Sequence, residues 1–160
     1  MEGARLATEA DVAAVTSLAA AARAELAAHR GGAVWHAHAA RTDPIEPEIR
    51  SQVARPPTAG CVVVGTVDAA VVGYGVSTLD TLSDGSILSV ISDLYVDPEA
   101  RGIGVGEAMM DLLVGHARAH GARGIDSLAL PGDRETKNFF ETFGLKARAI
   151  VVHRDLQDDA

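Results

Sequence analysis

The most informative stretch of the chain is Arg101-Gly102-Ile103-Gly104-Val105-Gly106. The apolar run Ile87–Val96 before it predicts a buried strand, which Asp97-Pro98 ends. The run Glu107–His120 after it predicts an amphipathic helix. Glycine lets the backbone approach a ligand closely, the first turn of a helix leaves N–H groups unpaired, and arginine adds a fixed positive charge. This turn from strand to helix therefore predicts a site for a phosphate or pyrophosphate group.

Two other phosphate-binding motifs do not fit this turn. The dinucleotide fingerprint needs a third glycine where Glu107 or Met109 stands, and no Gly-Lys-Ser/Thr sequence occurs in the chain. The alternative interpretation is a glycine-rich turn that binds nothing. The arginine at its head and the change from strand to helix favour a ligand.

In two motifs the chain resembles the GNAT superfamily of N-acetyltransferases. The first is Arg/Gln-x-x-Gly-x-Gly/Ala, matched by Arg101, Gly104 and Gly106 after a strand that ends in Leu94-Tyr95-Val96. The second is aromatic-Glu-x-x-Gly-hydrophobic, matched by the run from Phe140 to Leu145. The resemblance covers the whole chain, although only its second half carries specific motifs. It implies acetyl-CoA as co-substrate, an amine as acceptor, and direct attack of the neutral amine on the thioester in a ternary complex.

The resemblance also implies which residues hold coenzyme A. The glycine turn would bind the pyrophosphate, and backbone amides at the end of the strand would hold the pantetheine arm and the acyl carbonyl. Asp133 stands where an asparagine commonly contacts the pantetheine, and Lys137 lies on the same predicted helix face. The full set is Leu94, Tyr95, Val96, Arg101, Gly102, Ile103, Gly104, Val105, Gly106, Asp133, Lys137 and Phe140.

Two residues are candidates for catalysis. Asp93 is a carboxylate in an apolar strand, either a general base with a raised pKa or a structural acid bound to backbone or an arginine. Many relatives carry glutamate where this chain has Ser92. Phe140 occupies the position of the usual tyrosine acid and has no proton to donate. The competing hypothesis is a non-catalytic module that binds or senses acyl-CoA, and a more distant one is an interaction protein that keeps only the fold.

Histidines suggest two further sites. Trp35, His36 and His38 lie in the segment that covers the acceptor in GNAT-like proteins, so they are candidate acceptor-binding residues. The alternative is a loop anchored by Trp35 with both histidines in solvent. His116 and His120 have metal-ligand spacing, but no third ligand is evident, and we predict no metal site.

Composition limits the remaining possibilities. The chain has 160 residues, which predicts a single domain over 1–160, and 48% hydrophobic residues, which argues against disorder. A net charge of -8 argues against nucleic acid and favours a cationic acceptor. The only cysteine, Cys61, lies in an apolar run, which favours a core role and a reducing compartment. Without a membrane span or export signal, the sequence predicts a cytoplasmic protein, monomeric or homodimeric.

The pattern of elements predicts an α/β fold: a mixed, mostly antiparallel central sheet of about six to seven strands, flanked by helices. The predicted strands are Arg5–Thr8, Val62–Val67, Val71–Leu79, Ile87–Val96, Ile125–Leu130 and Leu145–His153. Predicted helices follow Thr8 up to the Gly31-Gly32 pair, then cover Glu46–Ala54, Glu107–His120 and the stretch from Asp133 to Phe143. The region from Ala33 to Pro57, which contains the predicted helix Glu46–Ala54, is the hardest to interpret.

Overall fold

The β-branched runs of the sequence form the centre of the sheet. The computed structural model describes residues 1–28, 32–128 and 134–157. Within them, five strands lie side by side in chain order, antiparallel except for the parallel pair of the fourth and fifth. They are β1 (Glu2–Leu6), β2 (Gly60–Val67), β3 (Ala70–Thr81), β4 (Ile87–Val96) and β5 (Ala122–Ser127). Asp68 and Ala69 have positive φ in the tight turn that joins β2 and β3, the strands predicted at Val62–Val67 and Val71–Leu79, into a hairpin.

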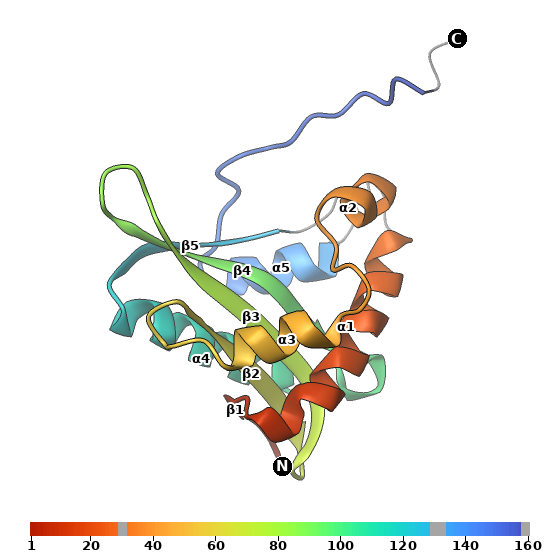
Figure 1. Ribbon diagram of the computed structural model, residues 1–160, viewed down its shortest axis with the longest axis vertical. Coiled ribbons are helices and arrows are strands. Elements are labelled where there is room, and N and C mark those ends of the chain that lie inside the picture. Colours follow the sequence, from red (N-terminus) through yellow and green to blue (C-terminus); the bar gives the residue numbers. More distant parts are fainter. Residues whose placement is uncertain (29–31, 129–133, 158–160) are drawn as a thin grey trace.

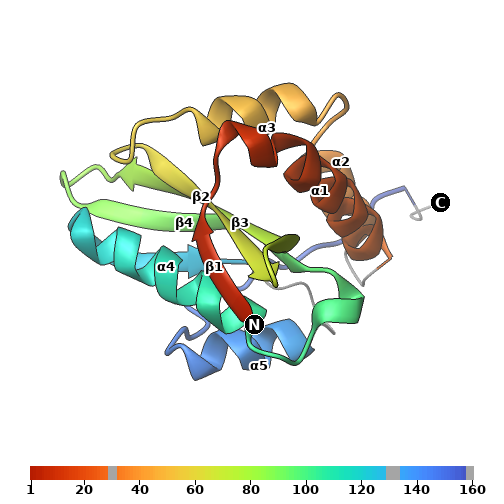
Figure 2. The same ribbon diagram turned by 90° about the horizontal axis from the view of Figure 1, so that it is seen from below.

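Helices cover both faces of this sheet. Figure 2 shows α1 (Val12–Ala27) and α3 (Glu46–Val53) on one face, and α4 (Val105–Ala119) and α5 (Arg134–Thr142) on the other. The short α2 (Gly32–His38) lies beside the end of α1 (Figure 1). The described helices are thus arranged in layers around the sheet. None of them is long and apolar enough to cross a membrane.

The start of α1 is fixed by a carboxylate. Asp11 accepts a hydrogen bond from the Thr8 backbone N–H at 2.7 Å, and the Arg5 guanidinium donates to it at 2.8 and 3.0 Å. Together these hold the pKa of Asp11 at about 2, below its usual value, with the Arg5 hydrogen bonds the largest cause. Asp11, the residue before α1, is therefore an anchor between β1 and α1.

Two apolar layers hold the sheet and helices together. Val15, Ile49 and Val76 belong to the layer on the α1 and α3 face, whereas Met109 and Leu113 belong to the layer on the α4 face. On the second face α4 approaches the sheet closely because β2 and β3 carry glycines there. A Cβ built on Gly65 would lie 2.4 Å from Val105 Cγ1, so no larger residue fits at this point without a shift.

A bulge in β4 determines which way its last residues face. Val76 pairs with Asp93, but the next residue, Ser77, pairs with Ile91, so Ser92 is the extra residue of the bulge. As a result Ile91 packs in the α4 layer, whereas Asp93, two residues on, lies on the opposite face beside Tyr74. Strict alternation along the strand would have placed both on one face.

The sheet opens between its last two strands, β4 and β5. The parallel ladder between β4 and β5 ends at the Ile91–Ser127 pair, whereas β4 continues to Val96. The side of Leu94–Val96 that faces β5 therefore has no strand partner in the described part of the chain. This separation of two neighbouring strands creates the opening in which the cleft lies.

Most predicted elements are confirmed, with one clear error. The strand predicted at Leu145–His153 is absent: these residues have no ladder, and Figure 1 shows them running away from the body. Ile150, Val151 and Val152 are all more than 80% exposed. Their composition favours a strand, but a strand needs a partner, and the sheet has five strands in the described residues, not the six to seven predicted. The predicted strand Ile125–Leu130 begins earlier, at Ala122.

Candidate functional site

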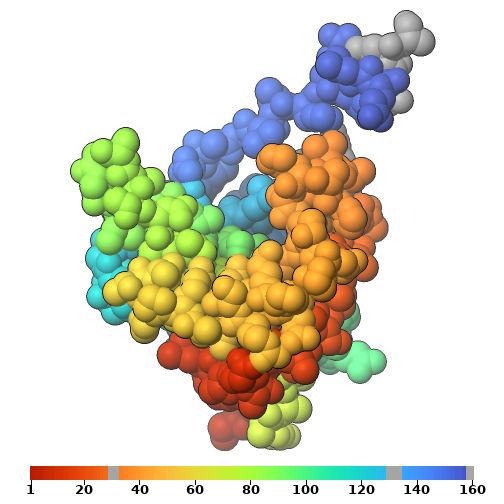
Figure 3. Space-filling model, in the orientation of Figure 1, coloured from red at the N-terminus to blue at the C-terminus, as the bar shows by residue number. Residues whose placement is uncertain are grey.

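A cleft of about 630 Å³ opens where β4 and β5 separate. Figure 3 shows this side of the molecule hollowed between α2, in orange, and the β3–β4 hairpin, in green. The wall of the cleft comes from α1, α2, α3, the ends of β4 and β5, the glycine turn and α5. Its volume is within the range of small-ligand sites. Of the residues predicted for coenzyme A, it is lined by Leu94, Tyr95, Val96, Arg101, Gly102, Gly106 and Phe140.

The glycine turn forms the N-terminus of α4 beside the cleft. Gly102 and Gly104 have φ of +83° and +100°, a region that favours glycine, and Gly104 is the N-cap. A Cβ on Gly102 would meet nothing within 4 Å, and one on Gly104 only the Glu2 side chain. The turn is therefore open on its outer side, and the first N–H groups of a 15-residue helix lie beside it. Val105 is buried beneath the turn and Ile103 is half-exposed, so neither lines the cleft.

Arg101 bridges three parts of the site. Its Nε donates to the Val96 carbonyl at 2.9 Å, while Nη1 and Nη2 donate to the two carboxylate oxygens of Glu25 at 3.0 and 2.9 Å. The guanidinium also lies over the Tyr95 ring, 5.3 Å from its centroid. The hydrogen bond to Glu25 raises the pKa of Arg101. Arg101 thus ties the end of β4 to α1, a role in addition to the phosphate contact that the resemblance implies.

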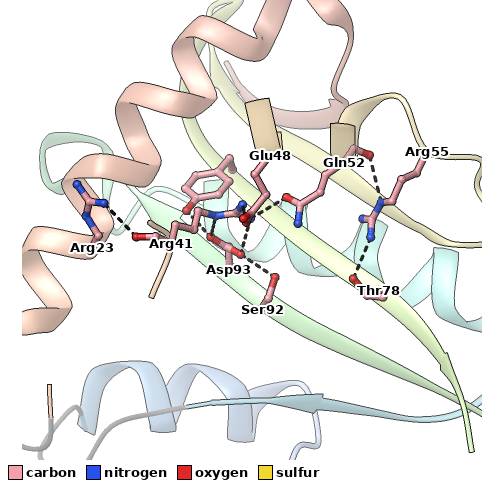
Figure 4. Close-up of polar contacts among 9 residues, drawn as sticks. Arg23, Arg41, Glu48, Gln52, Arg55, Thr78, Ser92 and Asp93 are labelled. Atoms are coloured by element: carbon pink, nitrogen blue, oxygen red, sulfur yellow. Dashed lines mark hydrogen bonds and ion pairs between the residues drawn. The ribbon is translucent and has the colours of Figure 1, made fainter. Parts of the chain in front are cut away.

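Asp93 is held at the floor of the cleft by three side chains (Figure 4). Arg41 Nε and Nη2 donate to its two oxygens at 2.9 Å each, and Tyr74 Oη and Ser92 Oγ donate at 2.6 Å. Burial by itself would raise the pKa of Asp93, but the hydrogen bonds and charge of Arg41 outweigh it, so this pKa lies below its usual value. An ionised, fully bonded carboxylate is a poor proton acceptor, which favours the structural role of Asp93 over the role of general base.

Arg41 is the centre of a larger network that sequence analysis missed. Its side chain is only 9% exposed, and besides Asp93 it donates to Gln52 Oε1 at 2.8 Å and to Glu48. Arg23 of α1 donates to the Arg41 carbonyl at 3.0 Å. Arg41 lies in the segment between α2 and α3, where the sequence has no periodic pattern, so no signal in the chain marked it. Glu25 was detectable, because it lies three residues after Ala22 at the edge of the buried stripe of α1.

The predicted acceptor residues separate in the structure. Trp35 is half-buried and lines the cleft. His36 and His38 are exposed on other sides of α2 and do not line it. The geometry therefore brings Trp35, but neither histidine, to the wall of the cleft.

On α5, two phenylalanines lie at the cleft wall. Phe140 is 7% exposed, and Phe139, also in the wall, lies beside it with ring centroids 5.9 Å apart. Lys137 is exposed and pairs with Glu141, outside the cleft. Asp133 lies outside the described residues. The wall that α5 presents thus combines these two rings with Glu135 and Thr136, and it offers no acidic proton at Phe140.

His116 and Cys61 lie away from the cleft. His116 Nε2 is 2.8 Å from the Pro57 carbonyl, and burial lowers the pKa of His116. Cys61 is buried, with its Sγ 3.4 Å from Ser77 Oγ, and burial raises the pKa of its thiol. Within the described ranges, no group of three or more histidine, cysteine or acidic side chains forms a metal-binding cluster.

The sequence and the fold both match known proteins. The sequence profile described as the acetyltransferase (GNAT) family matches residues 18–145. No curated protein matches the chain significantly in sequence.

Three solved structures illustrate the similarity in fold. A tetramutant of the BH1408 protein from Bacillus halodurans has a TM-score of 0.78 at 21% identity, covering 96% of this chain and 99% of that one. A ribosomal-protein-alanine N-acetyltransferase from Brucella melitensis biovar Abortus 2308 has a TM-score of 0.69 at 16% identity, covering 97% and 99%. AAC(6')-Iy, in complex with the bisubstrate analog CoA-S-monomethyl-acetylneamine, has a TM-score of 0.73 at 14% identity, covering 97% of each chain.

Proposed function

Because the chain belongs to the acetyltransferase (GNAT) family, we propose that it transfers the acetyl group of acetyl-CoA to a primary amine. The observation that carries this proposal is the unpaired end of β4 beside the N-terminus of α4. A strand edge without a partner offers backbone groups to an extended pantetheine arm, and a helix N-terminus offers N–H groups to a pyrophosphate. AAC(6')-Iy, which shares the fold, binds an analog that contains CoA.

The chain's own residues fit that ligand. The open glycine turn at Gly102 and Gly104 would hold the pyrophosphate, and the backbone of Leu94–Val96 would hold the pantetheine. Free N–H groups in this segment would also donate to the acyl oxygen as negative charge develops on it. Phe139 and Phe140 would exclude water from one side of the thioester.

The reaction we propose is direct attack in a ternary complex. The lone pair of a neutral amine forms a bond to the thioester carbonyl carbon, the C–S bond breaks, and the thiolate leaves with the electron pair. The nitrogen loses one proton to solvent or to a base. Holding both reactants in one cleft supplies much of the rate acceleration. A thiol of the cysteine type has a pKa of about 8.5, so its thiolate can leave without being protonated. The absence of an acid at position 140 should therefore slow the reaction without preventing it.

Two features of the cleft favour a second candidate function. Phe140 has no proton to give at the place of the usual acid, and Asp93 is neutralised by Arg41. Both would suit a module that binds or senses acyl-CoA without turnover. Release of free thiol from acetyl-CoA that depends on an added amine separates the two functions, because only the enzyme produces it.

The binding site is tested by a matched pair of glycine variants. Gly104→Asp places a carboxylate where the backbone is proposed to meet the pyrophosphate, and should abolish CoA binding measured by calorimetric titration. Gly85 in the β3–β4 turn has a similar φ of +85°, a Cβ built on it would meet nothing within 4 Å, and it does not line the cleft. Gly85→Asp controls for backbone strain and charge. Unchanged affinity in Gly104→Asp would disprove the site assignment.

The acceptor we propose is cationic. The protein has a net charge of -8, and three arginines and five carboxylates line the cleft. Each of those arginines is already paired with a carboxylate: Arg23 with Asp43, Arg41 with Asp93 and Arg101 with Glu25. The remaining negative charge should concentrate amines at the opening, so the initial rate with a cationic amine should fall as salt is added.

A further inference from the structure

The Arg41 network has one more negative charge than positive. Its single guanidinium binds two carboxylates, Asp93 and Glu48, and one amide, Gln52. Asp93 is 14% exposed and its two oxygens are occupied, so it balances Arg41 inside the protein. The charge of Arg41 is thus already balanced by Asp93, and Glu48 adds a second negative charge to the network.

Glu48 is placed to meet a ligand. It lies on α3, its side chain is 50% exposed, and it lines the cleft. Oε1 accepts the hydrogen bond from Arg41, and Oε2 has no hydrogen bond to any described residue. Figure 4 shows the Glu48 carboxylate beside the Arg41–Asp93 pair.

The nearest other cations are bound elsewhere. Arg23 donates to the Arg41 carbonyl and pairs with Asp43. Arg55 donates to Thr78 Oγ1 at 2.9 Å and to the Ser77 carbonyl at 2.8 Å. No second cation in the described part of the chain thus contacts the Glu48 carboxylate, and its uncompensated charge faces the cleft.

The reaction restricts what this carboxylate can bind. A nitrogen that attacks a thioester must be neutral, whereas an ionised carboxylate stabilises the protonated form of an amine beside it. Glu48 would therefore slow the reaction if it held the attacking nitrogen, but would favour it by holding a different cationic group of the same acceptor. Both positions belong to one cleft, because Glu48 and the end of β4 at Leu94–Val96 line the same cavity.

We infer that Glu48 binds a second cationic group of the acceptor, and that the preferred acceptors carry two amino groups a few carbons apart. The inference rests on the proposed acetyl transfer and assigns the acceptor class to the same cleft. In the ternary complex one nitrogen, unprotonated, lies at the end of β4, while the second, as an ammonium, donates to Glu48 Oε2. Arg41 keeps the carboxylate in place from the other side.

Paired series of acceptors test this inference. Initial rates of thiol release would be measured for α,ω-diamines of three to six carbons and for n-alkylamines of the same lengths. In the wild type, kcat/KM for the best diamine should exceed that for the matching monoamine by about tenfold, the scale of one charged hydrogen bond at a half-exposed site. Glu48→Gln should remove most of this preference, mainly by raising KM for the diamine.

The control is a residue of the same helix. Glu46, two positions before Glu48, is 52% exposed and also pairs with an arginine, Arg50, but does not line the cleft. Glu46→Gln should keep the wild-type preference. Glu48→Asp, which retains the charge, should keep part of it.

The possible results separate this inference from the proposed function. If the wild type acetylates diamines and monoamines equally, or if Glu48→Gln lowers both rates by the same factor, Glu48 only positions Arg41 and the inference is wrong. If the wild type releases no thiol with any amine, the proposed function fails and the inference fails with it. A preference for diamines that Glu48→Gln leaves intact would place the second cation elsewhere.

Discussion

Removing Arg41 should destabilise the protein through the charge it leaves behind. Arg41→Met keeps a long, unbranched side chain, but Asp93 loses both hydrogen bonds at 2.9 Å and the charge of the guanidinium. Breaking a buried pair by removing one partner costs about 3–5 kcal/mol. Tyr74 and Ser92 still donate to Asp93, so we expect the lower end, about 3 kcal/mol. That is a large fraction of the roughly 5–15 kcal/mol typical of a domain.

The assay is equilibrium unfolding in urea, followed by circular dichroism, for Arg41→Met, Asp93→Asn and the double variant. The double variant should be more stable than Arg41→Met alone, because Asp93→Asn removes the uncompensated charge.

The pH dependence gives a second check. In the wild type the pKa of Asp93 is lowered, so its stabilising effect is present above the usual carboxyl pKa and is lost as the pH falls. In Arg41→Met burial should raise that pKa, and the difference between the two proteins should shrink from pH 7 to pH 4. A cost below about 1 kcal/mol for Arg41→Met, or no recovery in the double variant, would refute this reasoning.

Three further predictions concern other parts of the molecule. Gly65→Ala should cost about 1–3 kcal/mol in urea unfolding, because the new Cβ would lie 2.4 Å from Val105 Cγ1, and adding Val105→Ala should recover part of it. Since the pKa of Asp11 is about 2 in the folded protein, its bonds to Arg5 should contribute about 1–2 kcal/mol above pH 4, after allowance for screening at the half-exposed arginine. The difference in unfolding free energy between wild type and Asp11→Asn should therefore close as the pH falls from 4 to 2, and a constant difference would contradict it. Phe140→Tyr should raise turnover by up to about 100-fold and add a decline at high pH, measured as amine-dependent thiol release; a wild type that already shows this decline has another acid.

The sequence predicts the parts of this molecule that local rules govern. The run Ile87–Val96 forms β4 with the predicted bounds, and the Asp68-Ala69 turn, α3 and α4 lie within a few residues of their predictions. The glycine turn is also where the sequence places it, because positive φ and a helix start depend only on neighbouring residues. The strand predicted from composition at Leu145–His153 is wrong, because a strand also needs a neighbouring strand to pair with, and composition carries no information about that neighbour.

Long-range contacts explain what could not be predicted in the site. Arg41 and Asp93 are 52 residues apart, and Arg101 and Glu25 are 76 apart. The first pair joins the segment between α2 and α3 to β4, and the second joins α1 to the turn that follows β4. Neither arginine has a feature in its local sequence that indicates its partner. The sequence identified Asp93 as a candidate but could not decide whether it is a general base or a structural acid. That distinction depends on its contact with Arg41, which comes from a segment without a periodic pattern.

Because of the bulge at Ser92, the number of residues in β4 can change at this position without changing the face on which the later side chains lie. Elsewhere in the strand, inserting or deleting a residue would exchange the faces of everything after it and carry Asp93 into the apolar layer beneath α4. At position 92 it would not, because the extra residue pairs with nothing and both cores keep their own side chains. Ser92 is exposed at the floor of the cleft, so its side chain can change without disturbing either layer. Position 92 is therefore a point where the lining of the cleft can change independently of the two apolar layers.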